Sequence, residues 1–250
     1  MSGALDGKVA LVTGAGRNIG RAIALGLARD GAAVVVNGRG DRAAVDAVVA
    51  EIVALGGRAI GVLADVSDAP AVTRMVAAAE DAFGGIDIAV SNAGLRRQTA
   101  FLDIPLAEWR EILSVALDGA FILAQAVVPS MIRRGGGAIV ALSGISTHVG
   151  TPNRAHVSAS KAGLEGLMRA LAVELAPHGI RCNSVAPGSI DTVRGAAAGA
   201  RPSTMTEAGI PLRRRGTVEE IAAVVRMLAG PEGGYITGQT IHVNGGAFLT

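Results

Sequence analysis

The sequence predicts an α/β fold, a doubly wound parallel sheet with helices on both of its faces. Apolar runs of strand length alternate with helix-length segments along the whole chain, and this alternation is typical of parallel sheets. The run 9–12 is apolar and β-branched, and a glycine-rich turn and a helical spacing of apolar residues follow it. A second strand, expected at 33–37, completes a strand–helix–strand unit of the usual length.

The same pattern predicts each element in turn. The strands are expected at 9–12, 33–37, 58–63, 87–91, 138–142, 180–186 and 239–243. The helices are expected from the glycine-rich turn to about residue 30, and at 41–55, 70–83, 106–117, 120–133, 156–176 and 218–229. Gly56 and Gly57 end the second helix in a common way, and Pro70 lies in the first turn of the third helix, where its missing N–H costs nothing.

The connecting segments give no sign of a second domain. A loop at 143–155 precedes the longest helix. The polar, glycine-containing stretch 189–216 has no firm period, so we expect it to be a mobile flap. Because no linker or low-complexity run divides the chain, residues 1–250 are predicted to form one domain.

Composition argues against several classes of protein. A chain of 250 residues, half of them apolar, is long enough to bury one large core. The formal charge is +2 and there is no basic tract, so no nucleic-acid partner is expected. Cys182 is the only cysteine, so neither a disulfide framework nor a thiolate metal site is expected, and no metal is predicted. The N-terminal residues are too polar for a signal peptide and no apolar run approaches a membrane span, which predicts a soluble, cytoplasmic protein without a membrane partner.

The segment from Gly14 to Gly20 has the features of a phosphate-binding turn. Its glycines let the backbone approach an anion, and the free amides at the start of the following helix point at that anion. The alternative is a plain strand-to-helix turn, since glycines serve such turns as well. The strand before it, the helix after it and the second strand downstream favour the phosphate site.

Several short motifs, in this order and at these separations, resemble those of the short-chain dehydrogenase/reductase family over essentially the full chain. They are Thr13-Gly14-Ala15-Gly16-Arg17-Asn18-Ile19-Gly20, Asp65-Val66, Ser91-Asn92-Ala93-Gly94, Lys161 on its helix, Pro187-Gly188-Ser189-Ile190-Asp191-Thr192 and Tyr235-Ile236-Thr237-Gly238. The resemblance implies a Rossmann-type fold of seven parallel strands, a nicotinamide cofactor, a small-molecule substrate and a homotetramer.

The resemblance also implies which residues hold the cofactor. The pyrophosphate would lie on Gly14, Arg17, Asn18, Ile19 and Gly20. Asn18 stands where the family usually has glycine, but asparagine accepts unusual backbone angles and caps helices well, so phosphate binding should survive. The adenine would meet Asp65 and Val66, and the remainder of the cofactor would meet Asn92, Ala93, Gly94, Lys161, Pro187, Gly188, Ile190 and Thr192.

The end of the second strand favours NADP(H) over NAD(H). NAD sites usually carry an acid there for the ribose 2′-hydroxyl, and that acid would repel a 2′-phosphate. In this chain the position is Gly38, followed by Arg39, and Arg17 reaches from the glycine-rich turn. Two guanidinium groups and no acid suit a phosphate. The alternative is that Arg39 is a solvated loop residue.

The catalytic half of the family pattern is largely missing. Lys161 is present, but the tyrosine position four residues before it holds Val157. The serine position holds Gly144 and the asparagine position holds Ala116. The only tyrosine of the chain, Tyr235, belongs to another motif, so the usual tyrosine-dependent proton transfer cannot operate.

His156, directly before the vacated tyrosine position, is the candidate for an alternative acid or base. A histidine at a helix start is more often a cap or a surface residue, and that alternative stays open. His148 is a weaker candidate. A ribose-binding role for Lys161 is better supported than a role as an acid–base partner.

Two functions of different classes fit these residues. The favoured one is an NADP(H)-dependent oxidoreductase that acts on a small carbonyl or alcohol by a tyrosine-independent proton transfer. The alternative is a catalytically impaired NADP(H)-binding subunit or sensor, and a non-redox enzyme is a weaker third. An anionic substrate could meet four arginines, although a solvated rim is the favoured interpretation of them: Arg96, Arg97, Arg154 and Arg194.

Overall fold

A sheet of seven parallel strands forms the centre of the molecule in a computed structural model that describes residues 3–193 and 207–250. The strand order is β3-β2-β1-β4-β5-β6-β7, and every neighbouring pair is parallel. The strands are β1 (Val9–Val12), β2 (Ala33–Gly38), β3 (Ala59–Leu63), β4 (Ile88–Ser91), β5 (Gly137–Leu142), β6 (Ile180–Pro187) and β7 (Thr240–Val243). The predicted fold class is therefore confirmed.

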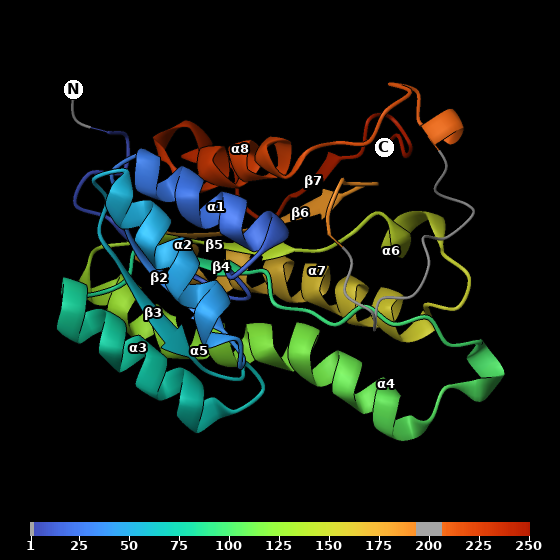
Figure 1. The fold of residues 1–250 in the computed structure, drawn as a ribbon, viewed down its shortest axis with the longest axis horizontal. Helices are drawn as coiled ribbons and strands as arrows, with labels where there is room; N and C mark the ends of the chain where they lie inside the picture. Colours follow the sequence, from blue (N-terminus) through green and yellow to red (C-terminus); the bar gives the residue numbers. More distant parts are fainter. Residues whose placement is uncertain (1–2, 194–206) are drawn as a thin grey trace.

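Helices cover both faces of the sheet (Figure 1). One layer holds α1 (Asn18–Arg29), α2 (Arg42–Ala54) and α8 (Val218–Ala229). The other holds α3 (Ala69–Phe83), α5 (Gly119–Arg133) and α7 (Ala155–Leu175), with α4 (Leu106–Leu113) leading into α5. The short helical turns are η1 (Phe101–Asp103), η2 (Ser114–Asp118), α6 (Ser146–Val149), η3 (Ala176–His178), η5 (Glu207–Gly209) and η6 (Pro231–Gly233).

The strand side chains alternate between two apolar cores. Ala10 and Val12 of β1 pack with α1, α2 and α8, whereas Leu11 packs with α3, α5 and α7. Both sets are fully buried. Because successive side chains of a strand point to opposite faces, a sheet covered on both sides needs an uninterrupted apolar run, and 9–12 is such a run.

The helices begin at the caps that the sequence supplies. The carboxylates of Asp41 and Asp68 accept hydrogen bonds from backbone N–H groups in the first turns of α2 and α3. Thr217 and Glu220 form a reciprocal capping box at the start of α8. Pro70 lies in the first turn of α3, as predicted.

The segment from Leu106 to Arg133 differs from the prediction in two respects. The predicted break between two helices is wrong, because α4, η2 and α5 run on as one helix of 28 residues in which η2 is a π turn. By length and composition alone this helix could cross a membrane, so the expectation that no apolar run approaches such a span is also wrong. Side chains such as Leu123, Val127 and Met131 lie buried in the core beneath the sheet, which accounts for its apolar character.

The connecting segments contain more structure than predicted. The loop expected at 143–155 contains the short helix α6, and η1 was missed as well. The stretch predicted as a flap, 189–216, lies partly outside the described residues. Within its described part, Ile190 pairs with Gly216 in an isolated parallel bridge.

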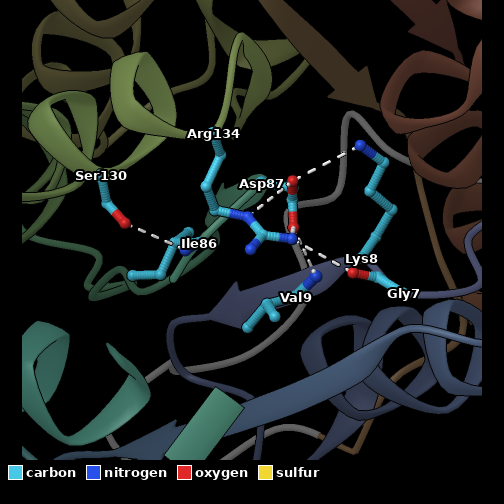
Figure 2. Close-up of polar contacts among 7 residues, drawn as sticks. All are labelled: Gly7, Lys8, Val9, Ile86, Asp87, Ser130 and Arg134. Carbon is cyan, nitrogen blue, oxygen red and sulfur yellow. Dashed lines mark hydrogen bonds and ion pairs between the residues drawn. The ribbon is translucent and has the colours of Figure 1, made fainter. Parts of the chain in front are cut away.

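Asp87 joins β1, β4 and the end of α5 at the amino edge of the sheet (Figure 2). Its carboxylate accepts a hydrogen bond from the N–H of Val9 at 2.8 Å. The guanidinium of Arg134 donates to it at 2.9 Å and also donates to the carbonyl of Gly7 at 3.1 Å. Lys8 approaches to 3.4 Å. The side chain of Asp87 is almost fully buried, so the two cations and the amide offset the cost of removing its charge from water.

We therefore predict that Asp87→Asn lowers the free energy of unfolding by roughly 2–4 kcal/mol, because it removes the carboxylate and leaves the partly buried guanidinium of Arg134 without its charge partner. Urea denaturation measures this change. The matched control is Asp46→Asn, which breaks the exposed pair with Arg42 and should cost less than about 0.5 kcal/mol. Equal losses in the two variants would contradict the structural role of Asp87.

Candidate functional site

The strand order reverses between β1 and β4, so the loops that follow these two strands diverge at the carboxyl edge of the sheet. The turn after β1 and the chain after β4 meet there. A Cβ added to Gly14 would lie 3.1 Å from the Cα of Ala93. One on Gly20 would collide with the carbonyl oxygen of Gly14. Both glycines are therefore required by close backbone approach.

Thr13 and Asn92 hold the two segments together. The amide of Asn92 donates to the carbonyls of Thr13 and Gly14 at 2.9 and 3.0 Å. The hydroxyl of Thr13 accepts from the backbone N–H groups of Asn92 and Ala93 at 3.0 and 3.1 Å. The resemblance implies that Asn92 meets the cofactor, and in the structure its side-chain amide group shapes the turn.

Asn37, at the end of β2, is a positioning residue that the sequence analysis missed. It is buried, and its side-chain oxygen, Oδ1, accepts a hydrogen bond from the N–H of Gly14 at 3.3 Å. Its amide group donates to the carbonyls of Val62 and Ala64 at 3.3 and 3.1 Å. The feature of the sequence that could have indicated this role is a lone polar residue at the end of an apolar strand.

Asn18 adopts the backbone angle expected of the glycine it replaces, with φ at 50°. The expectation that it caps the helix is wrong, because Arg17 is the N-cap of α1 and makes no side-chain capping bond. The side chain of Asn18 bonds instead to the backbone of Val193. Ile19 is buried beneath the turn, and Arg17 is exposed.

Asp65 and Arg39 lie near each other beyond β2 and β3. The Oδ1 atom of Asp65 accepts from the hydroxyl and the N–H of Ser67 at 2.6 and 2.9 Å. These bonds, with the charge of Arg39, hold the pKa of Asp65 below its ordinary value. Val66 is buried beside it.

The position where NAD sites carry an acid has little room for a side chain. A Cβ on Gly38 would lie 2.6 Å from a methyl group of Val45. Arg17 and Arg39 are both exposed, and no ion pair of either one occurs within 3–193 and 207–250. The exposed guanidinium of Arg39 therefore follows this position directly, with the carboxylate of Asp65 nearby.

Lys161 projects from α7 toward the carboxyl edge of the sheet. Its ammonium donates to the carbonyl of Leu142 at 2.6 Å. A Cβ added to Gly94 would lie 3.4 Å from the nitrogen of that ammonium. Burial, and to a lesser extent the positive charge of Arg96, lowers the pKa of Lys161 to about 8. This places Lys161 beside the chain that follows β4.

At the three positions where the family resemblance implies a tyrosine, a serine and an asparagine, the chain has Val157, Gly144 and Ala116. Val157 is buried, one helical turn before Lys161. Around Gly144 there is open space, because a Cβ there would meet only the hydroxyl oxygen of Ser146, at 3.8 Å. Ala116 is buried within the π turn η2.

His156 is fully buried. Its Nδ1 accepts from the N–H of Val157 at 3.0 Å, so Nε2 carries the proton and donates to Glu108 at 2.9 Å. Hydrogen bonds from Thr99 and His156 hold the pKa of Glu108 below its ordinary value. His156 thus ties the start of α7 to α4 and is not a surface residue.

The segment after β6 is anchored at its described ends. A Cβ on Gly188 would lie 2.7 Å from the Cα of Asn244, so the chain passes close to the end of β7. The N–H of Asp191 donates to the carbonyl of Gly216 at 2.8 Å. Pro187, Ile190 and Thr192 follow this path beside β7 and the turn after β1.

The interpretation of the arginines as a solvated rim holds for Arg96, which is exposed. Arg97 is ion-paired with Glu111 at 2.5 Å. For Arg154 the interpretation is wrong, because this side chain is buried. Arg194 lies outside the described residues.

A second buried cluster, also missed, lies behind Gly144. The Oε1 atom of Glu165 accepts from the hydroxyl of Ser143, and His148 Nε2 lies 3.1 Å from it. The ring of His148 contacts those of His242 and Phe248, with centroids 4.5 and 5.1 Å apart. The cluster fixes the segment from β5 to α6 against α7. A glutamate on the buried side of an apolar helix was the available signal.

Known proteins share both the sequence and the fold. Residues 14–247 match the family model described as Enoyl-(Acyl carrier protein) reductase. A 3-oxoacyl-[acyl-carrier-protein] reductase of Synechocystis sp. is 43% identical over 247 residues, which cover 98% of this chain and 99% of that protein. An L-rhamnose 1-dehydrogenase (NAD(P)(+)) of Sphingomonas sp. is 42% identical over 248 residues, or 98% of each chain. A crystal structure of a short chain dehydrogenase from Burkholderia cenocepacia J2315 in complex with NADP has a TM-score of 0.91 at 39% identity, covering 98% of this chain and 99% of that one.

Proposed function

Because this chain belongs to the short-chain dehydrogenase/reductase family of NAD(P)-dependent oxidoreductases, we propose that it transfers a hydride between NADP(H) and a small carbonyl or alcohol by a proton transfer that uses no tyrosine. One observation carries the proposal. Lys161 lies beside Gly94 at the carboxyl edge of the sheet, Gly14 and Gly20 shape the turn after β1, and Val157 occupies the tyrosine position.

The shape of the turn fits a dinucleotide. A Cβ would be blocked at Gly20 and crowded at Gly14, where φ is also positive, and α1 begins within the same turn. Asp65 uses only Oδ1 for Ser67, so Oδ2 would accept from the adenine amino group. When bound, the nicotinamide supplies or accepts the hydride. Besides Asp65, the residues that would hold the whole cofactor are Gly14, Arg17, Asn18, Ile19, Gly20, Val66, Asn92, Ala93, Gly94, Lys161, Pro187, Gly188, Ile190 and Thr192.

The charges at the end of β2 support NADP(H) over NAD(H). Arg39 is exposed directly after Gly38, a position that has no acid and little room for one, and Arg17 is exposed in the turn after β1. A guanidinium binds a phosphate through two parallel hydrogen bonds, whereas it gains little from a 2′-hydroxyl.

Lys161 is the group best placed to support proton transfer. A pKa of about 8 keeps it mostly protonated near neutral pH yet able to exchange its proton. It would hold the ribose and a water molecule that takes the place of the tyrosine hydroxyl. A catalytic role for His156 stays a prediction, and its buried contacts with Glu108 and Val157 favour a role in positioning α7.

A second candidate function is a non-catalytic NADP(H)-binding subunit or sensor. The observation that favours it is the apolar, buried side chain of Val157 at the tyrosine position, together with Gly144 and Ala116 at the serine and asparagine positions. In either case we propose a cytoplasmic protein of one domain that assembles as a homotetramer, as the family resemblance implies.

Arg39→Ala should weaken the binding of NADPH about tenfold, because one charge-assisted contact to the 2′-phosphate is lost. NADH binding should change less than about twofold, since NADH lacks that phosphate. Calorimetric titration of wild type and variant with both cofactors measures the difference. Equal weakening for both cofactors would contradict the proposed phosphate contact.

The pH profile tests the role of Lys161. Its pKa is lowered to about 8, so the ammonium loses its proton as the pH rises through that value. If the charged form holds the ribose and the water, kcat/KM should be level below about pH 8 and fall about tenfold per pH unit above it. Lys161→Arg, which stays protonated, should show no such fall. A level wild-type profile to about pH 10 would contradict this role.

Restoring the two hydroxyl groups distinguishes the candidate functions. Val157→Tyr combined with Gly144→Ser should raise the turnover of a simple ketone with NADPH by at least about tenfold. Val173→Tyr, on an exposed position of the same helix, is the matched control and should have no effect. Turnover by wild type supports the oxidoreductase. NADPH binding with turnover only in the double variant supports the non-catalytic subunit instead.

A further inference from the structure

A contact between Asn18 and Val193 joins the two ends of the proposed cofactor site. Asn18 stands where the family usually has glycine. The amide group of Asn18 donates to the carbonyl oxygen of Val193 at 2.9 Å. In return, the N–H of Val193 donates to the side-chain oxygen of Asn18 at 3.0 Å. The two residues are 175 positions apart in the sequence. We call this reciprocal pair of bonds the Asn18–Val193 clamp.

Asparagine is suited to this position for two reasons. The backbone of Asn18 has φ at 50°, in the left-handed region where glycine and asparagine are the best tolerated residues. Glycine adopts this angle freely but has no side chain to bond with. Asparagine alone combines tolerance of the angle with a neutral donor and acceptor on one short side chain. Asparagine in place of glycine at position 18 therefore adds a contact and keeps the backbone path of the turn.

The clamp joins segments with different proposed roles. Asn18 belongs to the turn that would hold the pyrophosphate, whereas Val193 directly follows Thr192, which would hold the nicotinamide carboxamide. The same segment is fixed at a second point, where Asp191 donates to the carbonyl of Gly216 at 2.8 Å and Gly216 donates to that of Ser189 at 3.0 Å. With the clamp in place, the chain from Ser189 to Val193 is held at both ends.

We infer that Asn18 is a positioning residue, which orders the nicotinamide end of the site before the cofactor binds. This inference rests on the proposed function. A segment that is already ordered does not lose conformational freedom when the ligand arrives, so affinity rises without any new contact to the ligand. Breaking two solvent-exposed hydrogen bonds would shift the equilibrium between the ordered and the unordered segment about tenfold toward the unordered form.

The experiment compares two ligands on wild type and Asn18→Gly. Glycine restores the family residue and accepts the backbone angle, so the variant should fold. NADPH spans both ends of the site, and its dissociation constant should rise about tenfold, mainly through a faster dissociation rate. The fragment 2′,5′-ADP keeps the 5′-phosphate but lacks the nicotinamide end, and its affinity should fall much less, by no more than about twofold. Calorimetry and stopped-flow fluorescence give the two quantities.

Two further variants test whether the clamp itself is responsible. Val193→Ala keeps both bonds, because they go to the backbone, and should retain the wild-type dissociation rate. Val193→Pro removes the N–H and should speed dissociation in wild type but not in the Asn18→Gly background.

Each other outcome has a distinct meaning. If wild type binds neither ligand, the proposed function fails and the inference fails with it. If wild type binds NADPH and Asn18→Gly binds it equally well or more tightly, the inference alone is wrong. If Asn18→Gly weakens both ligands alike, Asn18 only supports the turn, which also overturns the inference.

Discussion

The close approach of the turn after β1 to the chain after β4 is the constraint on which the rest of the site depends. Glycine is needed at Gly14 and Gly20 because backbone atoms occupy the space of a side chain. Thr13 and Asn92 fix this approach through four hydrogen bonds to backbone groups. All of these groups lie where the strand order reverses, and parallel α/β sheets bind their ligands at that place.

The two halves of the site differ in how complete they are. The proposed nucleotide end has Gly14 and Gly20, the carboxylate of Asp65 and the exposed Arg39, and neighbouring strands hold it in shape. Around Lys161, in contrast, apolar or small residues occupy the tyrosine, serine and asparagine positions: Val157, Gly144 and Ala116. Ala116 itself lies in the π turn η2.

Sequence patterns predicted the parts of the structure that depend on local chemistry. The strands follow from runs such as 9–12, and the positive φ of Asn18 follows from what asparagine tolerates. The side-chain partners could not be predicted in the same way. Asn37 bonds to β3 and to the glycine turn, and Asn18 bonds to Val193, so each partner comes from a distant segment that only the assembled sheet brings near. The continuous helix through η2 was missed because a π turn has no simple period in the sequence.

Titration of the purified protein with NADPH tests the central claim most directly. The account predicts saturable binding of one NADPH per chain, weaker binding of NADH, and loss of both in Gly20→Ala, whose added methyl group would displace the carbonyl of Gly14. A folded wild-type protein that binds neither cofactor would contradict the account, because the turn after β1 would then be a structural feature without its nucleotide.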